Sequence, residues 1–453
     1  MMPESPYKHS SGGGSMLLGF RAENARSFRE EIELSLLATR VADAEVVREI
    51  SWRGGGKPLG VLPAAGVFGP NGSGKSNLLR AMNDMRAFVL SSFRLGTPRS
   101  RLPTWPFRLG KDRGEVPSTY EVDLVIDGVR HRYGFRLDAS RILQEWAHWW
   151  PHGRPALLFQ REGDDVELPS GQRAGARAAL GILRSNALFL STAAAASHET
   201  LLPLFEWFQR NLLFADVNTR TARQALTAEL LEHVDYQDQV LDLLREADLG
   251  ITGASKQEMD PEMRERIMRA LSILHGEEEG PGGGEGDFEF EDFEVSLLHE
   301  AGGEEVELHP SEESRGTMVW FGMIGPVIEA LRNGSVLLAD ELEASLHPHL
   351  VNVLVGLFQG SRSNPNRAQL IFNSHDVTLM GDSTSHALGR DQIWFTEKGK
   401  DGGTRLYPLT DLAPRKGEAV ERRYLAGRYG ATPIVSRRQL ESIAEPVSAG
   451  ADR

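Results

Sequence analysis

The sequence predicts an α/β fold in which a mixed central sheet carries an antiparallel β subdomain and a helical insertion. An apolar run at 60–68 enters a glycine-rich turn, and helical spacing follows over 76–89. Alternating runs at 119–126 and 129–137 flank Asp127-Gly128, a dipeptide typical of a tight hairpin turn. Strands that alternate with helices indicate a sheet covered by helices, and the hairpin indicates antiparallel pairing beside it.

The first half of this fold is expected to span 16–196. Residues 1–15 are polar and rich in Gly and Ser, which predicts a disordered tail with Met16 as a candidate natural start. Strand-like runs begin at 17–37, and the β pattern continues beyond the hairpin to about residue 168. We interpret the tryptophans of that region as packing against the sheet.

The second half is expected to span 288–453, after a helical insertion at 197–275. Between them, residues 276–287 (GEEEGPGGGEGD) are acidic and Gly-rich, which predicts a flexible linker. Residues 316–332 have helical spacing. Short apolar runs predict further strands at 335–339, 369–373 and 391–395.

Composition limits the classes of function. The chain has 453 residues, with 50 Lys and Arg against 64 Asp and Glu, a net charge of −14. This length fits two or three domains, and 40% apolar with 25% charged residues excludes wholesale disorder. The absence of cysteine excludes a disulfide framework, cysteine-ligated zinc, iron–sulfur clusters and thiol catalysis. The acidic balance argues against a surface coated in positive charge, but it leaves room for a local basic groove.

No segment has the pattern of a signal peptide or of a membrane span. The N-terminal tail lacks an apolar core, and the longest apolar stretch, 318–331, is too short for a bilayer and contains Pro326. We therefore expect a cytoplasmic protein with no membrane partner.

Residues 69–76 (GPNGSGKS) fit the phosphate-binding loop GxxxxGK[ST], between a strand and a helix. Glycines let backbone N–H groups close around a phosphate chain, and the helix N-terminus adds a favourable dipole. Lys75 is expected to reach the β- and γ-phosphates, and the Ser76 hydroxyl to bind Mg²⁺. The expected nucleotide contacts are Gly69, Asn71, Gly72, Ser73, Gly74, Lys75, Ser76 and Asn77.

A second motif ends the apolar run 336–339. Asp340 follows this predicted strand and is expected to enter the Mg²⁺ shell. The next residue, Glu341, is placed to polarise a water for attack on the γ-phosphate. Together with the loop at Lys75, this motif predicts ATP as the ligand and Mg²⁺ as its metal.

The order of the remaining motifs resembles that of ABC-type ATPases. Asp340 lies 265 positions after Lys75, a separation far larger than a minimal nucleotide-binding domain needs. The run ESRGT at 313–317 opens a helix just before the second motif. After it come ASLHP at 344–348 and NSHD at 373–376, in the places of a D-loop and a switch histidine.

More closely, the chain resembles the stand-alone prokaryotic ABC-type ATPases related to SMC and DNA-repair heads. These serve in anti-phage modules, among them AriA of PARIS, PtuA of Septu and the ATPase half of OLD proteins, and the AriA-like, nuclease-free branch is the most similar. The likeness runs from about residue 17 to Pro433. Beyond the nucleotide motifs it is carried by 23–28 (ENARSF), 133–135 (YGF) with 145–146 (EW), 247–251 (ADLGI), 391–395 (DQIWF) and 424–431 (YLAGRYGA).

This resemblance implies a head that dimerises around ATP. Ser314 and Gly316 would contact the γ-phosphate bound to the partner's Lys75 loop, and His375 would sense that phosphate beside the catalytic Glu341. Thr317 stands where transporter-type signatures have a second Gly, which argues against a transporter subunit. Only 78 residues follow His375 and they hold no D-x-D pair, so we expect a separate effector, such as a Toprim-type nuclease, and a phage-encoded trigger.

Several alternatives stay open at this point. An SMC-like DNA-repair or DNA-clamping ATPase is the second hypothesis, with nucleic acid as a partner. The glutamine that ABC heads place on Mg²⁺ is not located by the sequence, and Gln144 and Gln160 are both candidates. We interpret His347 and His349 as D-loop residues rather than as a metal pair. Two groups of basic residues are interpreted as solvated faces: Arg94, Arg99, Arg101, Arg108 and Arg113, and Arg415, Lys416, Arg422, Arg423 and Arg428.

Overall fold

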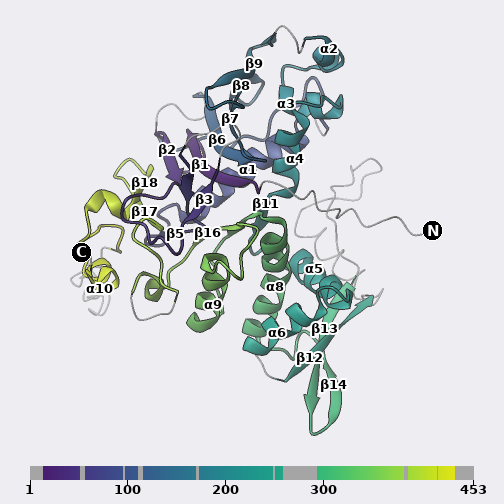
Figure 1. Ribbon diagram of the computed structural model, residues 1–453, viewed down its shortest axis with the longest axis vertical. Helices are drawn as coiled ribbons and strands as arrows, with labels where there is room; N and C mark the ends of the chain where they lie inside the picture. The colour runs from purple at the N-terminus through teal and green to yellow at the C-terminus, as the bar shows by residue number, and fades with distance from the viewer. Residues whose placement is uncertain are drawn as a thin grey trace, which may run out of the picture.

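The computed structural model describes residues 14–51, 57–94, 97–110, 116–169, 173–247, 250–258, 293–381, 386–415 and 417–433. Its centre is a six-stranded sheet of order β11-β15-β16-β5-β17-β18 (Figure 1). The first five of these strands are parallel, and β18 runs antiparallel to β17. Their bounds are β5 Ala64–Phe68, β11 Leu212–Ala215, β15 Val336–Ala339, β16 Gln369–Asn373, β17 Ile393–Lys398 and β18 Thr404–Pro408.

Helices cover both faces of the central sheet. On one face, the buried side of α1 (Lys75–Ser91) packs with Val67, Leu338 and Ile371. On the other, α8 (Arg315–Asn333) and α9 (Pro348–Gln359) pack with Leu337 and Phe372. Neighbouring strand residues such as Leu337 and Leu338 therefore belong to different cores, as the two-residue period of a strand requires. Apolar residues pack on both faces of these strands, which explains why the strands read as continuous apolar runs.

A second sheet of seven antiparallel strands carries the β subdomain, in the order β10-β9-β8-β7-β6-β1-β2. The expected hairpin is confirmed: β6 and β7 join at Asp127 and Gly128, which both have positive φ, at 49° and 75°. The strands are β1 Met16–Glu23, β2 Ile32–Ser35, β6 Ser118–Ile126, β7 Val129–Leu137, β8 Ile142–Trp150, β9 Ala156–Glu162 and β10 Asp165–Glu167. A further two-stranded sheet pairs β3 (Arg48–Ile50) with β4 (Leu59–Val61).

A buried ion pair ties this sheet to the helices that follow it. Glu145 on β8 and Arg161 on β9 are both fully buried, 3.7 Å apart. The Glu145 carboxylate accepts hydrogen bonds from the backbone N–H groups of Phe189 and Leu190, at 2.5 and 2.9 Å. These residues open α3 (Phe189–Ala195), so the carboxylate occupies the N-terminus that a helix offers to an anion. Helix α2 (Arg173–Ile182) precedes α3.

The segment 197–275 is not the purely helical insertion that the sequence predicts. It contains α4 (Leu202–Arg210), α5 (Arg220–Glu232) and α6 (Gln237–Ala247), but also β11, which pairs in parallel with β15. Four apolar residues are too short a run to separate a strand from a helix by spacing alone. The part at 259–275, the linker at 276–287, residues 1–13 of the tail and the last twenty residues of the chain lie outside the described residues.

A three-stranded antiparallel sheet of order β12-β13-β14 lies beside α5 and α6 and extends away from the body of the protein (Figure 1). Its strands are β12 Ile251–Glu258, β13 Phe293–Ala301 and β14 Glu304–Leu308. The C-terminal part adds the short helices η1 (Val377–Met380), η2 (Leu409–Leu412) and α10 (Val420–Leu425). Among the described residues, no helix is long and apolar enough to cross a membrane.

Candidate functional site

The phosphate loop lies where the sequence places it, between β5 and α1. Gly69, Gly72 and Gly74 have φ values of 155°, 74° and 106°, which residues with a Cβ rarely adopt. The space is also tight, because a Cβ on Gly69 would lie 2.5 Å from the carbonyl oxygen of Thr396. Glycine is therefore needed at Gly69 for both conformation and space.

Strands β17 and β18 contact this loop through the hydroxyl groups of their side chains. The Ser73 hydroxyl lies 2.7 Å from that of Thr396, and the Thr404 hydroxyl donates to the Ser73 carbonyl at 2.8 Å. Thr404 also bonds Ser27, which lies beyond β1. No sequence pattern marks Thr396 and Thr404, because hydroxyl residues on strands carry no motif.

Lys75 is 6% exposed, and its ammonium donates to the carbonyls of Gly69 and Pro70, at 2.9 and 3.3 Å. Burial lowers the pKa of Lys75, while the charges of Glu343, Glu341 and Asp340 oppose that change. The side chain thus lies over its own loop, within the field of three carboxylates. It is placed to meet anionic phosphate oxygens.

Asp340 follows β15, as predicted, and meets the start of α1. Its Oδ1 accepts from Nδ2 of Asn373 at 2.5 Å, and its Oδ2 lies 3.3 Å from Nη2 of Arg80. The same Nδ2 of Asn373 lies 3.2 Å from the Ser76 hydroxyl. Because one amide nitrogen contacts both oxygens, the hydroxyl and the carboxylate converge on one place.

This pair of oxygens fits Mg²⁺. The ion prefers oxygen ligands and is usually held by one or two protein groups, with phosphates and water supplying the rest. Among the described residues there is no group of three His, Cys, Asp or Glu that could hold a metal by themselves. Ser76 and Asp340 would hold the ion, which would neutralise phosphate charge.

Glu341 has a positive φ of 55°, and its backbone N–H is hydrogen-bonded to Oδ1 of Asn373. Its side chain is exposed. His375, also exposed, is held through its backbone N–H, which donates to Oε1 of Glu343 at 2.6 Å. Partial desolvation and the charge of Lys75 lower the pKa of His375. Glu341, Glu343 and His375 therefore belong to one connected loop system beside Lys75.

The predicted signature lies at the N-terminus of α8. Ser314 caps this helix, since its hydroxyl accepts the N–H of Thr317 at 3.0 Å. Gly316 packs against the D-loop, where a Cβ would lie 2.8 Å from the carbonyl oxygen of Ser345. The hydrogen bonds of Ser314 go to Thr317 and not to the phosphate loop of the same chain.

The residues whose roles the sequence left open lie outside the cluster of Ser76, Asp340 and Asn373. Gln144 and Gln160 lie on β8 and β9, and both bond Glu162. His347 caps α9, with its Nδ1 accepting the N–H of His349 at 3.2 Å. The basic residues Arg94, Arg99, Arg101 and Arg108 are exposed, while Arg113 and Lys416 lie outside the described residues.

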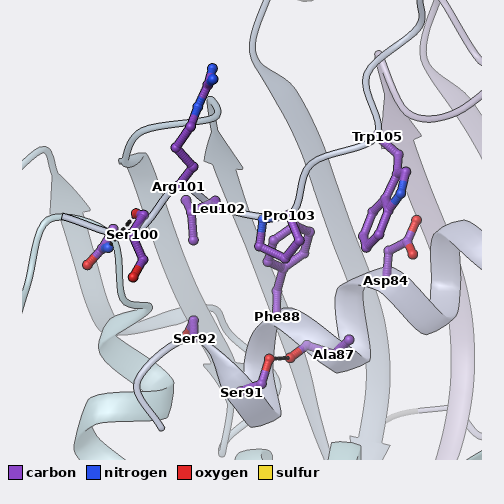
Figure 2. A pocket seen from close by; sticks show the side chains of 11 residues that line it. Asp84, Ala87, Phe88, Ser91, Ser92, Ser100, Arg101, Leu102, Pro103 and Trp105 are labelled. Atoms are coloured by element: carbon purple, nitrogen blue, oxygen red, sulfur yellow. Dashed lines mark hydrogen bonds between the residues drawn. The ribbon is translucent and has the colours of Figure 1, made fainter. Parts of the chain in front are cut away.

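A small cavity of about 140 Å³ lies along the second half of α1 (Figure 2). Phe88 and Pro103 form its middle, with Trp105 and Asp84 at one end. Asp84 makes two hydrogen bonds of 2.6 Å with Arg26, whose guanidinium lies over Trp105. Burial raises the pKa of Asp84, and Arg26 opposes this. Since Asp84 lies about 13 Å beyond Lys75 along the helix, this cavity is separate from the phosphate loop.

Residues 64–381 match a family described as "AAA domain, putative AbiEii toxin, Type IV TA system". The matched range starts at the first residue of β5 and ends just after η1, so it contains the phosphate loop, Asp340, Ser314 and His375. It covers well over half of the chain. The chain belongs to this family. It contains an AAA-type ATPase domain, with the α/β fold expected from its motifs.

Solved structures with some likeness include an SMC head bound to the C-winged helix domain of ScpA, with 13% identity, a TM-score of 0.40, and coverage of 88% of this chain and 99% of that chain. The SMC head domain from Thermotoga maritima has 11% identity and a TM-score of 0.36 over 86% and 98%. The recombination mediator protein RecF with ATP has 13% identity and a TM-score of 0.33, with coverage of 88% of this chain and 100% of that chain. No curated protein sequence matches the chain significantly.

Proposed function

We propose that this AAA-family chain binds and hydrolyses ATP with Mg²⁺ at the interface of a head-to-head dimer. The observation that supports this most is the convergence of Ser76 and Asp340 on Asn373, beside Lys75 and Glu341. A phosphate loop and a strand-end carboxylate that meet in this way are the parts that phosphoryl transfer to water requires.

Each residue has a distinct role in this proposal. Lys75 and the loop N–H groups bind the β- and γ-phosphates, and Ser76 with Asp340 holds the metal. Glu341 accepts the proton of the attacking water, and its exposed side chain leaves it accessible to that water. His375 contacts the γ-phosphate as a neutral imidazole, since its pKa is lowered.

The position of Ser314 and Gly316 supports the proposed dimer. They lie at a helix N-terminus, where backbone N–H groups bind anions, but their contacts are with Thr317 and Ser345 rather than with their own phosphate loop. A second copy of the chain would bring its bound γ-phosphate to this end of α8. Two composite sites would then form between two heads.

At the level of the cell, we propose a cytoplasmic sensor and scaffold in bacterial anti-phage defence. ATP would hold the heads together with a separate effector, such as a Toprim-type nuclease, and a phage-encoded trigger would release it. The family description, which names a toxin of a type IV system, supports a link to controlled toxicity. Co-purification of the chain with the product of a neighbouring gene tests this role, and failure to form a complex in every nucleotide state would contradict it.

The dimer is tested by the native mass of the Glu341→Gln variant with and without ATP and Mg²⁺. Removal of the base should trap ATP and give an ATP-dependent doubling of mass. Ser314→Arg in the same background should abolish the doubling, because a long cation would fill the anion site at the start of α8. Ser361→Arg, on an exposed loop after α9, is the matched control and should keep it. A mass that ATP does not change would rule out composite sites.

A DNA-repair or DNA-clamping ATPase is the second candidate. The exposed arginines after α1, Arg94, Arg99, Arg101 and Arg108, favour it as a local basic surface on an acidic chain. In that case duplex DNA would raise the ATPase rate, and added salt would remove the effect. Charge reversal at Arg99 and Arg101 would abolish the stimulation without changing the basal rate.

A further inference from the structure

Asn373 is the last residue of β16 and is completely buried. Its backbone pairs with Val67, two residues before the phosphate loop, in the parallel ladder between β16 and β5. The carbonyl oxygen of Asn373 accepts the N–H of Leu342 at 3.3 Å. The residue is thus fixed by the sheet between the phosphate loop and the turn that follows β15.

The side-chain amide of Asn373 joins three positions of the nucleotide site. Its Nδ2 donates to Oδ1 of Asp340 at 2.5 Å and to the Ser76 hydroxyl at 3.2 Å. Its Oδ1 accepts the backbone N–H of Glu341. A primary amide has two N–H donors and one carbonyl acceptor, so it can make all three bonds at once.

These bonds have different consequences for the three partners. The Ser76 oxygen that accepts from Asn373 keeps a lone pair for a cation. The Asp340 carboxylate, between Asn373 and Arg80, is held in one orientation by bonds to both of its oxygens. Glu341 adopts a left-handed conformation that is unfavourable for a residue with a Cβ, and the bond to its N–H stabilises that conformation.

We propose that Asn373 is a positioning residue that assembles the Mg²⁺ site and holds Glu341 in its left-handed conformation. The inference rests on the proposed binding of Mg·ATP at this site. Aspartate would lose both donors and place a second carboxylate next to Asp340. Serine would offer a single donor for two acceptors, so among residues of this size only asparagine supplies the full set.

The test measures how strongly Mg²⁺ and nucleotide binding are linked. The affinity for the non-hydrolysable ATP analogue AMP-PNP is measured by calorimetry with Mg²⁺ and with EDTA, for wild type, Asn373→Ala and Asn373→Ser. The metal-free affinity should stay within about twofold, because the loop itself is unchanged. The gain in AMP-PNP affinity that Mg²⁺ produces should fall about tenfold in the alanine variant, which is the scale of a lost hydrogen bond to a charged group. In the serine variant this gain should fall less. The ATPase kcat should fall along with this gain.

The matched control is Asn364→Ala. Asn364 is 1% exposed and also makes three side-chain hydrogen bonds, to the backbone of Phe358 on α9 and of Ala368 just before β16. This variant should lose stability but keep the full gain from Mg²⁺. If both alanine variants lose stability and neither loses the gain, Asn373 is only structural and the inference is wrong. Should Asn373→Ala not fold, Asn373→Ser decides by the same comparison. A wild type that binds no AMP-PNP would overturn the proposed function instead.

Discussion

At the scale of single residues, Glu343 links the acids after β15 to His375. Its Oε1 accepts the backbone N–H of His375 at 2.6 Å. Its charge is also the strongest of the carboxylate influences that raise the pKa of Lys75, ahead of Glu341 and Asp340. Glu343 thus acts on both the phosphate-binding cation and the residue proposed to sense the phosphate. The sequence shows only an acid in a loop, with no motif of its own.

Substitution of Glu343 by Gln should lower the pKa of His375 further. Desolvation and Lys75 already lower this pKa, and Glu343 and Glu341 oppose them, so the loss of one carboxylate leaves Lys75 less compensated. The imidazole titration is followed by NMR, with His375→Gln used to assign the signal. An unchanged or raised midpoint would contradict the argument.

The lowered pKa of His375 also determines how this residue makes the stability of the protein depend on pH. Because folded His375 has a lower pKa than an unfolded histidine, the unfolded state binds more protons as the pH falls below about 6.5. The contribution of His375 to stability is therefore present above about pH 6.5. It is lost as the pH falls from there through the lower pKa of the folded state.

At the scale of elements, α5 is joined to α8 around Pro326. Proline has no N–H, so the carbonyl of Gly322 lacks its usual helical partner, and Nη1 of Arg223 approaches that oxygen at 3.4 Å. One turn after Arg223 on α5, the Thr227 hydroxyl donates to the carbonyl of Phe321 at 2.7 Å and accepts the N–H of Gly325 at 2.9 Å. The helix that begins at the signature is thus held by the polar side chains of α5.

Thr227→Val should therefore destabilise the protein by about 1–3 kcal/mol, since it leaves buried backbone groups of α8 without their partner. Urea unfolding measures the change. Thr192→Val is the control, because the Leu188 carbonyl that accepts the Thr192 hydroxyl also accepts the Thr192 N–H and stays satisfied. Equal losses in the two variants would show that Thr227 has no special role around Pro326 of α8.

At the scale of the whole molecule, the central sheet is built from both halves of the chain. Strand β5, which leads into the phosphate loop, lies between β16 and β17, and β11 pairs with β15. One apolar core lies on each face, and both contain residues from either half. The nucleotide site exists only where these strands meet.

Fragments 1–258 and 259–453 should consequently fail to fold when each is expressed alone. The first would expose β5 without either neighbour, and the second would lack the strand between β16 and β17. Co-expression should restore a soluble complex with a single cooperative thermal transition by circular dichroism. A cooperative transition of either fragment by itself would show that the halves are independent domains.

The sequence by itself determined the features that depend on short segments. The conformations of Gly69 and Gly74, the helix that begins at Lys75 and the start of a helix at 313–317 are set by interactions within a few residues, so a local pattern predicts them. The buried strand before Asp340 was likewise expected. Their shared order along the chain predicted an ABC-type ATPase, and the family match shows an AAA-type ATPase domain.

Only the tertiary structure decided which distant groups complete the site. Asn373 lies 32 positions from Glu341 and 297 from Ser76 along the chain, and Thr404 lies 331 from Ser73. Strand β11 was hidden inside an apparently helical segment because four apolar residues have no decisive period, and its place beside β15 selects the extended form. Hydrogen bonds and strand pairing of this kind depend on where the sheet brings two segments together, which no local pattern specifies.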